Sequence, residues 1–131
     1  MNQIMSTFEI ADLIISVTGQ MDSLFNYWMS ASFAVLISSY IGKEHFNYSI
    51  TLSISVLYFL ASLMFLARYY AMSTLILYYT GLAGDSLPPE FIAASPIIGI
   101  TRAPTFIIGC IITEVYLWHS YMRNRSEESN T

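Results

Sequence analysis

Long runs of apolar residues alternate with short polar intervals along this chain. Residues 23–42 contain no charged side chain, and residues 46–67 contain none either. A third apolar run, 96–119, contains Arg102 and Glu114. A helix rises about 1.5 Å per residue and the hydrocarbon core of a bilayer is about 30 Å thick, so about 20 residues suffice for a span. Each of the three runs is therefore long enough to cross a membrane as a helix.

The pattern predicts an all-α integral membrane protein that forms a single membrane domain over residues 1–131. Its three transmembrane helices are expected at 23–42, 46–68 and 96–121. A loop over 81–95 is expected from its glycine and proline residues, and a polar tail over 122–131. For residues 69–84 three alternatives stay open: an extension of the second span to about residue 80, a surface helix, or a fourth span.

A short amphipathic helix is expected before the first span, over residues 5–20. Ser6 and Glu9 have the spacing of a capping box, which marks a helix start. Four apolar side chains then recur on one helical face: Ile10, Leu13, Ile14 and Val17. Asp22 is placed to cap the first span, since aspartate favours the N-cap position. The N-terminal segment is thus predicted as a separate helix on the membrane or against the bundle.

Aromatic residues stand near the ends of the expected spans. Tyr27 and Trp28 lie near one end of the first span and Tyr40 near its other end. Tyrosine and tryptophan are enriched where a membrane meets water. These residues are accordingly expected at the membrane surface.

Composition excludes several other classes of protein. Apolar residues make up 55% of the chain and charged residues 11%, which is too apolar for a soluble domain of 131 residues. The net charge is −4, and the five basic residues are scattered, so no nucleic-acid surface is expected. Cys110 is the one cysteine, and we expect it to serve as a small packing residue.

The few basic residues give an expected orientation. Three spans place Lys43, Arg123 and Arg125 on one side of the membrane, and Arg68 and Arg102 on the other. Because basic residues favour the cytoplasmic side, the N-terminus is expected outside and the C-terminus in the cytoplasm. A bacterial inner membrane is the expected location, since helical spans do not suit the outer membrane.

Small residues recur every fourth position in two of the expected spans. The first row is Ser30, Ala34, Ser38 and Gly42, and the second is Thr101, Thr105, Gly109 and Thr113. Such rows let two helix backbones approach closely. They are candidates for helix packing, either inside one chain or against another copy or another membrane protein.

Two charged residues fall inside the third span. Charges within a membrane are costly and are often functional. Arg102 and Glu114 lie 12 residues apart, about 18 Å along a helix, so they are not expected to pair with each other. Arg102 is expected to meet Asp85, Glu90 or Asp22, and a role in an ion or proton path is the alternative.

Four titratable residues are expected near the inner surface: Glu44, His45, Glu114 and His119. Two histidines and two carboxylates have the chemistry to bind zinc or relay protons. Their spacing matches no known metal motif, and a histidine beside the lipid headgroups is the favoured interpretation. No metal and no cofactor is therefore predicted.

Catalytic motifs are absent from the sequence, so the protein is not expected to be an enzyme. The favoured function is that of a non-catalytic subunit or assembly factor, which acts in the bilayer by helix–helix association. The alternative is an oligomeric small transporter, channel or pore. Three spans followed by a charged tail resemble the plan of phage holins of the three-helix type, although this tail is shorter and less basic. That resemblance implies a holin-like pore.

Overall fold

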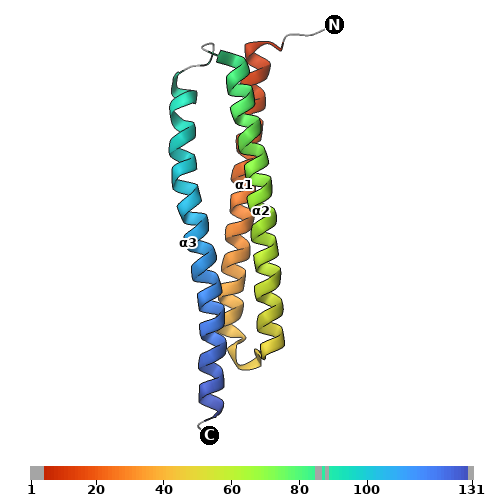
Figure 1. Cartoon of the computed structure of the whole chain (residues 1–131), viewed down its shortest axis with the longest axis vertical. Helices are drawn as coiled ribbons and strands as arrows, with labels where there is room; N and C mark the ends of the chain where they lie inside the picture. Colours follow the sequence, from red (N-terminus) through yellow and green to blue (C-terminus); the bar gives the residue numbers. More distant parts are fainter. Residues whose placement is uncertain (1–4, 85–86, 88, 130–131) are drawn as a thin grey trace.

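Three long helices make up most of the chain in a computed structural model (Figure 1). The structure describes residues 5–84, 87 and 89–129; for residues 43 and 89–99 it describes the backbone alone. Helix α1 is Thr7–Ile41, the 3₁₀ turn η1 is Lys43–His45, α2 is Tyr48–Ala83 and α3 is Pro89–Glu128. All three α-helices are long and apolar enough to cross a membrane. The expectation of an all-helical chain with three such helices is confirmed.

The helices run up and down as an antiparallel bundle. Helices α1 and α2 lie side by side over their whole length and make the most extensive contact, and α3 packs along the pair (Figure 1). The turn between α1 and α2 lies at the same end of the bundle as the C-terminal end of α3. The structure therefore places 43–45 and the tail together, as the three-span plan requires.

Helix α1 is one continuous helix of 35 residues, about 52 Å long. The expected separate helix over 5–20 is instead the first half of α1, and Asp22 lies inside the helix rather than at a cap. The capping box at its start is confirmed: Glu9 N donates to Ser6 Oγ at 3.3 Å and Ser6 N to Glu9 Oε2 at 2.7 Å. The helix continues because one buried stripe, with Ile14, Met21 and Trp28 seven residues apart, runs past residue 20.

Helix α2 extends to Ala83, so residues 69–83 continue the second helix, as one of the three alternatives had it. Asn47 caps its start, with Asn47 Oδ1 accepting from Ile50 N at 2.9 Å. Gly84 follows its end with a φ of 54°, a conformation that favours glycine. The expected loop over 81–95 is shorter, since α3 already begins at Pro89, and proline suits a first helical position.

The first halves of α1 and α3 and the second half of α2 together form one end of the bundle. There Ile10 and Ile14 pack on Ala83 and Leu87, with Ala11 and Tyr79 against them. The described part of the expected tail is helical too, because α3 continues to Glu128. Each helix is thus much longer than a bilayer core is thick.

The interior of the bundle mixes apolar and small polar side chains, and much of its surface is apolar. Among the described residues Trp28, Phe65 and Leu117 are buried, and so are five polar ones: Ser32, Ser39, Thr51, Ser62 and Thr113. Exposed positions include isoleucines on all three helices, phenylalanines on α1 and α2, and leucines on α2. A water-soluble bundle of this size does not expose so many large apolar side chains, while helices in lipid do, and they often meet through small and polar residues.

Candidate functional site

A cluster of aromatic side chains fills the interior near the middle of the bundle. Trp28 of α1 is 6% exposed, and its ring lies 4.8 Å from Phe106 of α3 and 5.9 Å from Phe65 of α2, centroid to centroid. Phe65 and Phe106 stack at 4.9 Å, and Phe25 lies beside Trp28 at 5.7 Å. Trp28 was expected at the membrane surface, and its burial corrects that expectation. The indole lies where all three helices meet.

Helix α3 reaches Trp28 closely because residue 109 is glycine. A Cβ atom at Gly109 would stand 2.5 Å from Cη2 and 3.2 Å from Cζ2 of the Trp28 ring. Thr113, one turn further on, is also buried, and its hydroxyl donates to the Gly109 carbonyl at 2.8 Å. Two members of the second small-residue row therefore pack inside the chain. Thr101 and Thr105 of the same row are exposed.

A hydrogen-bonded polar cluster lies beside the aromatic one. The indole Nε1–H of Trp28 donates to Ser62 Oγ at 3.3 Å, and the Cys110 thiol donates to the same oxygen at 3.6 Å. The hydroxyls of Ser32 and Tyr58 share a bond of 2.7 Å, and Tyr58 also reaches Cys110 Sγ at 4.0 Å. These contacts join all three helices. Cys110 serves as a partly buried packing residue here.

Glu114 points its carboxylate into the interface between α2 and α3. The Ser55 hydroxyl donates to Glu114 Oε2 at 2.7 Å. Glu114 Oε1 is buried and has no hydrogen-bond partner among the described residues, and neither has the buried hydroxyl of Thr51, one helical turn from Ser55. A buried carboxylate oxygen without a donor or a cation is costly in an apolar medium. Among the described residues no basic side chain forms an ion pair with this carboxyl group.

Arg102 pairs with Asp22, one of its three expected partners, and the guanidinium also lies 5.9 Å from the centre of the Phe25 ring. Asp85, a second candidate, lies outside the described residues, and the side chain of Glu90, the third, lies outside them as well. The Arg102 side chain is 19% exposed and that of Asp22 is 50% exposed. This ion pair ties α1 to α3 at one level of the bundle, and Arg102 and Glu114 have separate partners.

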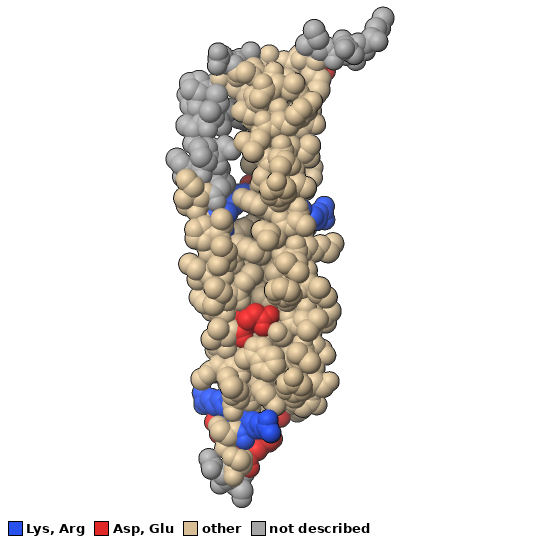
Figure 2. Space-filling view, viewed as in Figure 1, with Lys and Arg blue, Asp and Glu red and all other residues tan. Residues whose placement is uncertain are grey.

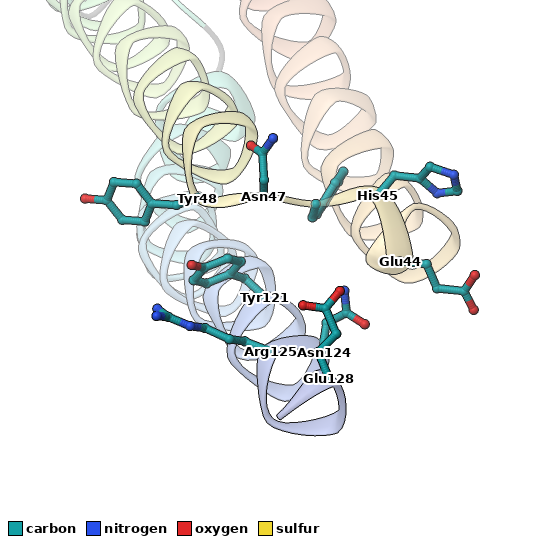
Figure 3. Close-up of a pocket in the computed structure, with 9 residues that line it drawn as sticks. Glu44, His45, Asn47, Tyr48, Tyr121, Asn124, Arg125 and Glu128 are labelled. Atoms are coloured by element: carbon teal, nitrogen blue, oxygen red, sulfur yellow. The ribbon is translucent and has the colours of Figure 1, made fainter. Parts of the chain in front are cut away.

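The four residues of the expected inner-surface cluster are not brought together as a site. Glu44 and His45 belong to η1, where both are exposed, and their side chains point away from α3 (Figure 3). His119 is exposed on α3, and Glu114 bonds to Ser55 inside the bundle. In the described ranges no group of three or more histidine, cysteine or acidic side chains could hold a metal ion.

A shallow pocket of about 260 Å³ does lie at this end of the bundle. Its walls come from η1, the start of α2 and the last turns of α3 (Figure 3). Asn124 and Glu128 point into the space between the helices, while Tyr48 and Arg125 extend to one side.

The first small-residue row faces outward. Ser30, Ala34 and Ser38 are exposed, whereas Ser32 and Ser39 of the same helix are buried. At 100° per residue Ala34, in the middle of the row, lies about 160° around α1 from Ser32 and about 140° from Ser39. Gly42, the last member, forms the turn after α1, where a Cβ atom would stand 2.9 Å from the Ser38 carbonyl oxygen. Packing inside the chain therefore leaves this face of α1 unused.

Comparison with known protein families, with curated proteins and with solved structures finds no match to this chain. The described part of the chain is all-helical, and its three helices are long and apolar enough to cross a membrane. Its interior combines aromatic and aliphatic side chains with a few small polar ones, and small and polar residues are common where helices meet in lipid.

Proposed function

We propose that this protein is a non-catalytic subunit or assembly factor of a membrane complex, which acts through helix–helix association on the exposed face of α1. The observation that carries the proposal is the outward position of Ser30, Ala34 and Ser38. Three small side chains one turn apart let a second helix approach closely. The opposite side of α1 already packs on α2 and α3, so this face is left for another chain.

The proposed setting is a bacterial inner membrane, with the N-terminus outside and the C-terminus in the cytoplasm. Lys43, Arg123 and Arg125 lie at one end of the bundle, and this grouping supports a cytoplasmic position for that end. The other end of the bundle, built around Ile10 and Ile14, would then extend beyond the outer surface.

Replacing Ala34 by leucine tests the association. A leucine side chain in a close helix–helix contact costs about 1–3 kcal/mol, so we expect association to weaken about tenfold or more. The measurement is the mass of the purified protein in mild detergent by light scattering, together with the identity of whatever co-purifies. The wild type is expected as a discrete complex, and the variant as a single chain of 14.8 kDa.

Ala61→Leu is the matched control, because Ala61 is an exposed small residue of α2 outside the row. It is expected to leave the complex intact. A complex that survives Ala34→Leu would contradict the proposal, and so would a wild-type protein that is itself a single chain.

A second candidate is an oligomeric small transporter, channel or holin-like pore. The specific observation in its favour is Glu114, whose Oε1 atom is buried without a partner between α2 and α3. Ionisable groups in this position mark ion and proton paths in many membrane proteins. In this hypothesis several copies together form the path that one bundle is too narrow to hold.

Glu114→Gln separates the two candidates. If Glu114 carries protons or cations, the variant in lipid vesicles is expected to lose most of a proton or sodium flux that the wild type shows. Glu127→Gln is the control, because Glu127 is exposed and pairs with Arg123 near the end of α3. A wild-type protein whose vesicles leak no faster than empty ones, at any pH, would exclude the transporter.

A further inference from the structure

A groove of about 400 Å³ runs between α1 and α2 on the outside of the bundle. Most of its lining residues carry polar side chains, and one of them is an arginine. The lining residues are Ser16, Gly19, Gln20, Ser23, Leu24, Tyr27, Arg68 and Met72. No carboxylate lines the groove, so its electrostatic character is set by Arg68.

Several hydrogen-bond donors in the groove have no partner in the described part of the chain, although the Ser23 hydroxyl donates to the Gly19 carbonyl at 3.0 Å. Within the described part of the chain, Arg68 makes no ion pair, and no hydrogen bond satisfies Ser16, Gln20 or Tyr27. The nearby carboxylate of Asp22 is already paired with Arg102. A guanidinium, an amide and two hydroxyls around one groove form a donor-rich site that suits an anion.

The groove lies at the boundary between charged and uncharged surface. Arg68 ends the uncharged run 46–67, and Asp22 precedes the uncharged run 23–42. Figure 2 shows basic side chains part way along the bundle, then a broad surface that is free of charge apart from one acidic patch, and then the charged end of the bundle. A bilayer that covers the uncharged surface places the groove among lipid headgroups, where the exposed Tyr27 is also favoured.

Apolar surface continues from the groove toward the uncharged side. Met64 lies one turn of α2 from Arg68 and is 65% exposed, and Leu60 lies one turn further and is also exposed. A molecule held by its anionic group at Arg68 would thus have apolar surface for hydrocarbon chains directly beside it.

We propose that this groove binds the phosphate group of a membrane phospholipid. Arg68 pairs with the phosphate oxygens, and Gln20 and Tyr27 donate hydrogen bonds to them, while the acyl chains lie along Leu60 and Met64. Arginine suits this role because its planar group forms two parallel bonds to phosphate. An anionic lipid is preferred to a zwitterionic one, since no ammonium group then competes for the phosphate. This proposal does not depend on whether the face of α1 with Ser30, Ala34 and Ser38 binds another chain.

Native mass spectrometry of the detergent-purified protein tests the site. The probes are phosphatidylglycerol and phosphatidylcholine with the same acyl chains. We expect the wild type to retain one phosphatidylglycerol per chain, and to retain phosphatidylcholine more weakly. Arg68→Gln is expected to weaken the retention of phosphatidylglycerol about tenfold, the usual effect of losing one hydrogen-bonded charge. Arg125→Gln removes the same charge at the other end of the bundle and is expected to change nothing.

Equal retention by the wild type and Arg68→Gln would overturn the proposal. Circular dichroism of Arg68→Gln and Arg125→Gln shows whether each variant is folded. Tyr27→Phe removes one hydroxyl and is expected to weaken the retention of phosphatidylglycerol by a smaller factor than Arg68→Gln. Glycerophosphoglycerol, the headgroup without its chains, distinguishes a lipid from a free phosphate compound. If it displaces the lipid at equal concentration, the groove is a soluble phosphate site and the lipid proposal is wrong.

Discussion

Replacing Trp28 by alanine is expected to lower the free energy of unfolding by about 3–5 kcal/mol, the usual cost of removing a buried aromatic side chain. The indole is 6% exposed, fills the point where three helices meet, and donates a hydrogen bond to Ser62. Its loss opens a cavity lined by Phe65 and Phe106 and leaves the Ser62 oxygen with one donor fewer. Reversible unfolding by SDS in mixed micelles, followed by circular dichroism, measures the change.

Trp118→Ala is the matched control for this prediction. Trp118 is half-buried near the end of the bundle, where it packs on Tyr48 and Tyr121 at 6.2 and 6.0 Å between ring centres. Its removal is expected to cost clearly less than that of Trp28, because lipid or water can fill the space. Equal effects of the two alanine variants would show that Trp28 does not hold the helices together.

The second large effect is expected from adding one methyl group at Gly109. Alanine at this position places its Cβ 2.5 Å from the Trp28 ring, so either the ring or α3 must move. We expect a destabilisation of about 1–3 kcal/mol, although alanine is the better helix former. The same unfolding experiment measures it, and tryptophan fluorescence reports whether the ring has moved.

Gly19→Ala provides the opposite expectation with the same chemical change. Nothing lies within 4 Å of a Cβ atom at Gly19, which is exposed in α1. Alanine there is expected to stabilise the protein by up to about 1 kcal/mol, because glycine is a poor helix former. If both alanine variants stabilise the protein alike, the close contact between α3 and Trp28 does not exist in solution.

Prediction from the sequence succeeded where the signal is local. Ser6 and Glu9 are three residues apart, and their capping box needs nothing beyond the first turn of α1. It was less successful at helix ends. Asp22 has the chemistry of a cap, but the helix continues through it, and the buried stripe that includes Met21 and Trp28 runs past it.

The candidate site was predicted only in part. The position of Glu114 within a span was visible in the sequence, whereas its hydrogen bond to Ser55 joins residues 59 positions apart. Trp28 was missed because an aromatic residue near a span end also fits a membrane surface. Ser32 and Tyr58 lie near the middle of the expected spans, and their contact joins residues 26 positions apart, which no local pattern indicates. A seven-residue repeat was available as a signal, at Thr51, Tyr58 and Phe65 of α2. A search for apolar residues alone does not find this repeat, because Thr51 and Tyr58 carry hydroxyl groups.

The sequence by itself determined that the chain is helical and that three stretches are apolar enough to cross a membrane, because helix formation and hydropathy depend on neighbouring residues. Only the tertiary structure decided how each helix is rotated about its axis. That rotation buries Trp28 against Gly109, places Asp22 where it pairs with Arg102, and leaves Ala34 exposed. In a chain that is apolar on every face, hydrophobicity does not distinguish one face from another, and the shapes and hydrogen bonds of facing side chains make the choice.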